Sequence, residues 1–150
     1  MEELYNKLKE KHVLPDFDLL NKEFELYTID EDYFLLREIR KKIIEKADSA
    51  VKLFDDILHP DPGFSSYREA NVFSDSDRDG MIITYKRLML FKRSATELSF
   101  EDSEESNARF INSFVKEWPD LKRSVLAFAK RLKDSWEKDI PKKEVVGYLG

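Results

Sequence analysis

The residues best suited to bind an ion lie together in the string Asp75-Ser76-Asp77-Arg78-Asp79-Gly80. Three carboxylates at alternate positions, those of Asp75, Asp77 and Asp79, can converge on one Ca²⁺ ion when the segment forms a loop. The glycine would permit the sharp turn that such a loop needs. The spacing therefore raises the hypothesis of a calcium site with these three aspartates as ligands.

The residues that follow depart from a complete calcium loop. The string matches the first half of an EF-hand loop, and Ile82 occupies its usual apolar position. The twelfth position should hold a bidentate acid, but here it is Lys86, and Arg78 adds another cation. The alternative is a connector rich in Asp and Ser, whose acids cap and polarise the next helix. We favour this alternative over a calcium site.

Few residues could support catalysis. The only histidines are His12 and His59, and Asp56 shares a helical face with His59 but completes only half a metal site. We favour an interaction of His59 with the last carbonyls of its own helix. The chain has no Cys, no Gly-x-Ser-x-Gly sequence and no glycine-rich phosphate loop. Hydrolysis by paired carboxylates stays open, but we expect no cofactor and favour a protein that is not an enzyme.

Three clusters of basic residues lie on predicted helices and suggest a surface that follows a phosphate backbone. They are represented by Arg37, Lys41, Lys86, Arg93, Lys130 and Arg131. Acids such as Glu38, Glu45 and Asp134 interleave with them at ion-pairing distance, which favours a solvated, charged surface. The net charge of −5, from 26 Lys and Arg against 31 Asp and Glu, also disfavours sequence-independent coating of nucleic acid.

The composition indicates a cytosolic globular protein. The first residues lack the basic and apolar regions of a secretory signal, and no apolar run approaches the length that spans a bilayer. Eleven Phe, six Tyr and two Trp predict an aromatic-rich core. The absence of Cys and Gln, together with abundant Lys and Glu, is typical of thermophilic proteins, so we expect a high melting temperature.

The clearest predicted element is a long helix over about 30–58, with Asp30 at its start. Its apolar seam advances in steps of three and four through Leu36, Ile39, Ile43, Ala47, Ala50, Phe54 and Ile57. The prolines and glycine of 60–63 end it.

Shorter periodic patterns predict further helices over 2–11, 16–26 and 81–98. Another helix ends at Trp118, because Pro119 disfavours helical geometry in the residue before it, and a new helix begins at Pro119. For residues 64–80 the sequence is compatible with either helical turns or an ordered loop. Residues 99–105 are predicted to connect two helices.

These patterns predict an all-α, single-domain protein over residues 1–150. Five to six helices form either a bundle or an orthogonal array, and the apolar tail 141–150 either docks or is flexible. The long seam and the tail either present apolar surface to a partner or are covered by the shorter helices of the same chain, and both alternatives stay open. From the first we expect a non-enzymatic cytosolic interaction or assembly protein that self-associates. A nucleic-acid-associated protein is the alternative, and a degenerate calcium-loop protein the third; no membrane partner is expected.

Overall fold

The computed structural model describes residues 1–140 and confirms the all-α fold, with no strand in that range. The helices are α1 (Glu2–His12), α2 (Phe17–Phe24), the 3₁₀ turn η1 (Leu26–Thr28), α3 (Leu35–Leu58), α4 (Phe64–Ala70), α5 (Asp75–Phe100) and α6 (Glu104–Asp139). The predicted docking or flexible tail, 141–150, lies outside the described residues.

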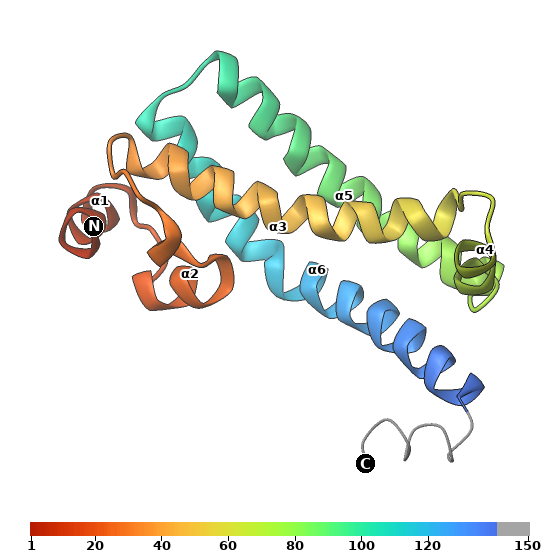
Figure 1. Cartoon of the computed structure of the whole chain (residues 1–150). Helices are drawn as coiled ribbons and strands as arrows, with labels where there is room; N and C mark the ends of the chain where they lie inside the picture. The colour runs from red at the N-terminus through yellow and green to blue at the C-terminus, as the bar shows by residue number, and fades with distance from the viewer. Residues whose placement is uncertain (141–150) are drawn as a thin grey trace, which may run out of the picture.

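Three long helices form the body of the molecule (Figure 1). The chain runs out along α3, returns along α5 and runs out again along α6, so α5 is antiparallel to the other two. Helices α1 and α2 cover one end of this body, and α4 covers the other. The arrangement agrees with the predicted helical bundle.

The seam of α3 is the centre of the core. All seven of its predicted apolar residues, from Leu36 to Ile57, are buried within the chain. An aromatic cluster extends this core between α2, α5 and α6, with Phe114 packed against Phe24, Phe91 and Trp118 at ring-centroid distances of 5.9, 5.0 and 5.3 Å. The aromatic core expected from composition is therefore present, and the seam needs no partner to cover it.

The predicted start of the long helix at Asp30 is wrong, because α3 begins at Leu35. Ile29 is buried, and the chain from there to Phe34 runs outside helical geometry. Phe34 has a left-handed backbone with φ of 54°, and its carbonyl accepts the first hydrogen bonds of α3 from Arg37 and Glu38. The capping carboxylate of Asp30 is therefore not used at this helix end.

The segment 75–80 is helical rather than a loop, so α5 begins six residues earlier than expected. Ser74 caps it: its hydroxyl accepts from the Asp77 N–H, and the Asp77 carboxylate accepts from the Ser74 N–H in return. This reciprocal capping box satisfies two backbone donors and starts the helix at Asp75. Helical turns also form over α4, and the connector between α5 and α6 is only 101–103.

Pro119 does not end a helix, contrary to prediction. It lies inside α6, which continues through it for a total of 36 residues. Trp118 and Leu121, on either side, are buried against the rest of the core. Packing of both halves of α6 therefore outweighs the loss of the hydrogen bond that proline cannot donate.

Candidate functional site

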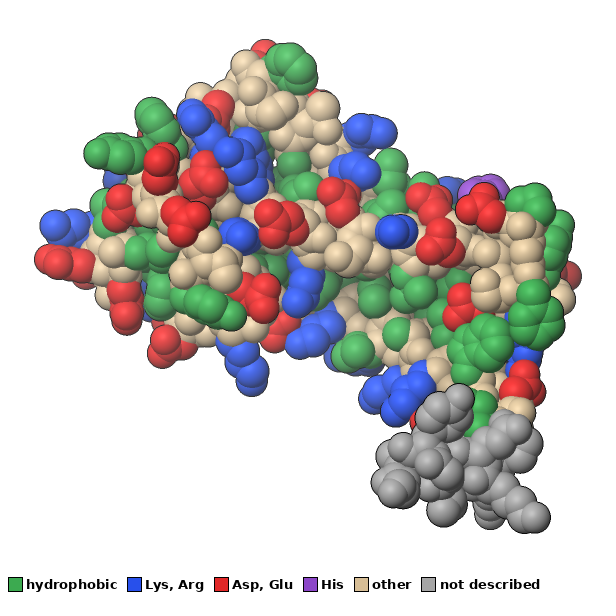
Figure 2. Space-filling view, in the orientation of Figure 1, with side chains coloured by type: hydrophobic (Ala, Val, Ile, Leu, Met, Phe, Trp, Pro, Cys, Tyr) green, Lys and Arg blue, Asp and Glu red, His purple; other side chains and the backbone are tan. Residues whose placement is uncertain are grey.

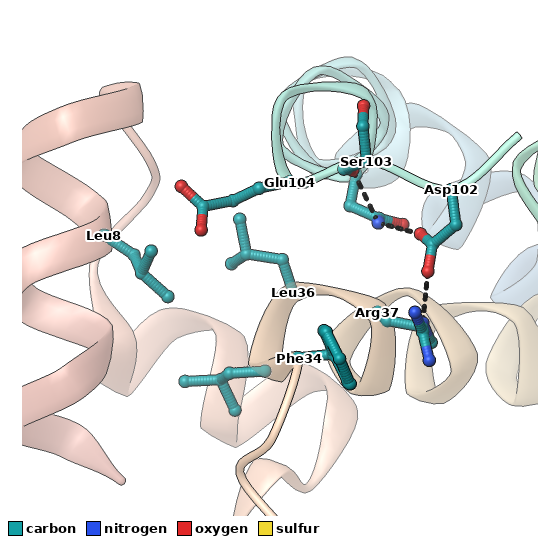
Figure 3. Close-up of a pocket in the computed structure, with 9 residues that line it drawn as sticks. Leu8, Phe34, Leu36, Arg37, Asp102, Ser103 and Glu104 are labelled. Atoms are coloured by element: carbon teal, nitrogen blue, oxygen red, sulfur yellow. Dashed lines mark hydrogen bonds and ion pairs between the residues drawn. The ribbon is translucent and has the colours of Figure 1, made fainter.

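The candidate site is a cavity of about 260 Å³ where α1, the start of α3 and the start of α6 meet. Leu8, Phe34, Leu35 and Leu36 supply its apolar side, whereas Arg37, Asp102, Ser103, Glu104 and Asn107 supply its polar side. Figure 3 shows Leu8 reaching from α1 toward Leu36, with Asp102, Ser103 and Glu104 placed across from them at the head of α6. The cavity thus combines an apolar side with a charged one.

A buried polar network lies behind the cavity. Arg40 is only 5 % exposed, and its Nη1 donates to Asn107 Oδ1 at 2.9 Å. Asn107, 3 % exposed, donates through Nδ2 to Asp102 and to the Ser103 carbonyl. Burial lowers the pKa of Arg40, but an arginine stays charged at any ordinary pH. The network therefore holds a buried cation and fixes the connector 101–103 onto α3.

Arg37 joins the two sides of the cavity. Its Nε donates to Asp102, and its guanidinium carbon lies 4.3 Å from the centre of the Phe34 ring. Burial would raise the pKa of Asp102, but hydrogen bonds from Asn107 and Arg37 hold that pKa below its ordinary value. Asp102 is therefore an ionised anchor, and the cation–π contact orients Phe34.

Glu104 ties α6 to α1 at the edge of the cavity. Its Oε1 lies 2.7 Å from both His12 Nε2 and Lys11 Nζ. The hydrogen bond from His12, followed by that from Lys11, lowers the pKa of Glu104. No serine or other nucleophile is hydrogen-bonded to His12 among residues 1–140, so this pair resembles a structural clamp more than a catalytic base.

Large exposed aromatic side chains belong to the segments that line the cavity or stand close to them in the sequence. Tyr33 and Phe34 are 77 % and 71 % exposed, and Phe100, two residues before Asp102, is 87 % exposed. Phe34 also lines the apolar side of the cavity and carries the left-handed backbone described above, which Val13 and Glu25 share elsewhere in the described chain. A bulky non-glycine residue in that region is strained by about 1–3 kcal/mol and is a recognised mark of functional segments.

The three predicted calcium ligands lie on the first two turns of α5. Asp77 is engaged twice, by the Ser74 cap and by a bidentate pair with Arg131 at 2.8 and 2.9 Å. The Arg131 hydrogen bond, then those from Ser74, lower the pKa of Asp77. Within residues 1–140, no group of three or more His, Asp or Glu side chains is placed to hold a metal ion. Asp77 is therefore a helix cap and ion-pair partner, and all three aspartates lie on a helix rather than in a loop.

The predicted nucleic-acid residues are dispersed rather than aligned. Arg37 pairs with Asp102, Lys41 with Glu38 and Arg131 with Asp77. Lys86, Arg93 and Lys130 are exposed and form no ion pair with the described residues. Because Asp77 and Asp102 flank α5 at opposite ends, Arg131 and Arg37 are separated by roughly the 39 Å length of that helix. The structure does not bring the six residues together.

Sequence reasoning missed the residues that build the cavity. Tyr33 and Phe34 had been placed inside a helix, where their exposure beside a cavity was not apparent. One signal was available: Arg40 falls four residues after Leu36 and three before Ile43, so a charged residue occupies a seam position. A buried arginine implies polar partners from elsewhere in the chain, although periodicity does not identify Asn107 and Asp102.

Comparison with known proteins gives no relative for this chain: no protein-family model, no curated protein and no solved structure matches it. None of the described helices is both long enough and apolar enough to cross a membrane.

Proposed function

We propose that this chain is a non-enzymatic, cytosolic helical interaction protein that binds a protein segment at the cavity between α1, α3 and α6. The observation that carries the proposal is Phe34, an aromatic side chain that is strained, 71 % exposed and part of the cavity wall. Val13 and Glu25 share this left-handed backbone, but Phe34 is the one of the three that lines the cavity, so its exposed ring is well placed to meet a partner.

The surroundings of Phe34 support binding of a protein. Aromatic residues and arginine are enriched at the energetic centres of protein interfaces, and Tyr33, Phe100 and Arg37 accompany Phe34 here. The side chains of the polar network behind them hydrogen-bond to one another. We therefore assign the binding role to the exposed aromatic residues and not to this network. The long seam of α3, from which an interaction role was first expected, is covered and lends no support.

The test is selection of binding peptides from a random display library, followed by measurement of dissociation constants. The decisive variant is Phe34→Asn, because asparagine tolerates a left-handed backbone and should preserve the fold while removing the ring. Phe64→Asn is the matched control, since Phe64 is equally exposed but lies at the opposite end, on α4.

We expect enriched peptides to bind the unmodified chain and the Phe64→Asn variant with the same affinity. Their affinity for Phe34→Asn should be lower by at least about tenfold, which is the effect of removing a typical interface hot-spot residue. Failure to enrich any peptide, or equal binding to all three proteins, would contradict the proposal.

Two earlier expectations stay as predictions with their own tests. Self-association now requires a surface other than the α3 seam, and light scattering over a range of concentrations measures it directly. Nucleic-acid binding would rest on Lys86, Arg93 and Lys130, whose charges are free of described partners. A gel-shift assay at low salt tests it, and no retention of RNA or DNA would end that alternative.

A further inference from the structure

We infer that the segment bound at this end is basic and inserts one apolar side chain into the cavity. The inference rests on the proposed function and specifies the chemistry of the partner. It combines two independent features of the site, the charge around the cavity and the size of the cavity itself.

Four exposed acids stand one to four positions in the sequence from residues that line the cavity, and we call these four the acidic rim. Asp30 and Glu31 precede the exposed aromatic pair, while Glu101 and Glu105 flank the connector that carries Asp102. These four acids are exposed, and none forms an ion pair within the part of the chain that the structure describes. Asp32, next to Glu31, lies 3.8 Å from the N-terminal amino group, so the start of α1, which carries Glu2 and Glu3, lies near this acidic segment.

The cations at this end offset only part of that charge. Lys11 is paired with Glu104, Arg37 with Asp102, and Arg40 is buried. Lys7 and Arg109 remain exposed on neighbouring turns of α1 and α6, against six exposed carboxylates without an ion pair. Figure 2 shows acidic side chains over this end of the molecule, interspersed with hydrophobic side chains and with Lys and Arg. A surface of this sign attracts Lys- and Arg-rich segments and repels acidic ones.

The cavity fits one side chain rather than a separate small molecule. Its volume of about 260 Å³ is below the roughly 300–1,000 Å³ of typical small-molecule sites. Leu8, Leu35 and Leu36 offer an apolar contact on one side, and the exposed ring of Phe34 lies at the edge. An aliphatic or aromatic anchor flanked by lysine or arginine would therefore bury its apolar surface while its charges meet the rim.

The experiment uses synthetic twelve-residue peptides and the full chain. The test peptide carries one central leucine flanked by lysine and arginine; one comparison peptide replaces every base with glutamate, and another replaces the leucine with serine. Dissociation constants are measured to the millimolar range at low and high salt, against the unmodified chain and Phe34→Asn. A double variant, Glu31→Gln with Glu101→Gln, removes rim charge, and Asp56→Asn with Asp61→Asn is its control near α4, on exposed acids without an ion pair.

We expect only the basic leucine peptide to bind well. High salt should weaken this binding, and the Phe34→Asn substitution should largely abolish it. Removal of two rim charges should weaken binding about three- to tenfold, and the control pair should not. Phe34-dependent binding that is indifferent to peptide charge, or Phe34-dependent binding of a second copy instead, overturns this inference but leaves the proposed function standing. If no peptide binds in a Phe34-dependent way, both this inference and the proposed function are overturned. If basic peptides bind Phe34→Asn as well as the unmodified chain, the insertion of an apolar side chain beside Phe34 is overturned.

Discussion

At the scale of single residues, the most consequential group is the buried guanidinium of Arg40. Taking a charge out of water is unfavourable unless hydrogen bonds replace its hydration. Asn107 supplies one of those bonds at 2.9 Å, and Asp102 lies 3.6 Å from the same Nη1. The three side chains come from α3, α6 and the connector between α5 and α6, so their contacts hold three parts of the chain together at the candidate site.

Replacement of Asn107 by alanine should therefore destabilise the protein. The change removes the amide that accepts from Arg40 and donates to Asp102, and we expect a loss of about 1–3 kcal/mol in the free energy of unfolding. Urea denaturation measures it. Asn6→Ala, at an exposed position of α1, is the control and should change stability by less than about 0.5 kcal/mol. A comparably small change for Asn107→Ala would show that the network contributes little.

Two carboxylates at this end, those of Asp102 and Glu104, predict how stability depends on pH. The pKa values of Asp102 and Glu104 are lower in the folded chain than their ordinary values, so the unfolded chain binds more protons in acid. The stabilisation is present above the ordinary carboxyl pKa, and we expect it to be lost as the pH falls from about 5 to 3. Urea midpoints at several pH values measure this. The variant Asp102→Asn should show a shallower decline, and an unchanged slope would contradict the assignment.

At the level of residues, the sequence indicated local ion pairs and helix caps but not contacts between distant residues. Acids interleaved with the basic clusters do pair with them, as Lys41 does with Glu38. The capping role favoured for the 75–80 acids also appears, through Asp77. No local pattern indicated that Asp77 would meet Arg131, 54 residues away, because that contact depends on how α5 and α6 pack.

At the scale of elements, periodicity located the helices well and their ends poorly. The seam of α3 was predictable because its burial repeats every three to four residues. Its start was not, because Asp30 is a suitable cap by type, yet the chain bends at Phe34 before helical geometry begins. Likewise, local rules place a boundary at Pro119, while burial of Trp118 and Leu121 keeps α6 continuous.

That continuity predicts that Pro119→Ala stabilises the protein. Proline cannot donate to the Val115 carbonyl and crowds the preceding turn, whereas alanine restores the bond and suits a helix. Pro119 is itself exposed, so no packing is lost. We expect the free energy of unfolding to increase by about 1–3 kcal/mol. Calorimetry would show this as a melting temperature that is higher by roughly 2–4 °C for each kcal/mol. Pro62→Ala, outside any helix, should lower stability slightly instead. A lower melting temperature for Pro119→Ala would mean that α6 needs the proline to reach both of its packing surfaces.

At the scale of the whole molecule, one end combines a cavity, an exposed aromatic residue with a left-handed backbone and a group of acids that form no ion pair within residues 1–140. The three-helix body buries its seams internally, and the end formed by α1 and the starts of α3 and α6 carries the cavity, the strained aromatic residue and the acidic rim. Other exposed apolar residues exist, including Ile83 and Leu90 on α5, and Phe64 and Tyr67 on α4. Ile83 and Leu90 lie along α5, and Phe64 and Tyr67 line a more open hollow of about 530 Å³ at the opposite end of the body.

We propose that peptides bind at the end formed by α1 and the starts of α3 and α6. NMR can test this by identifying which residues a bound peptide contacts. Backbone amide shifts of the labelled full chain would be followed while the tightest selected peptide is added. We expect the largest changes in amide chemical shift at residues 33–37, at residues 100–107 and around Leu8. Changes centred on Ile83 and Leu90, or on α4, would contradict it and would place recognition elsewhere on the molecule.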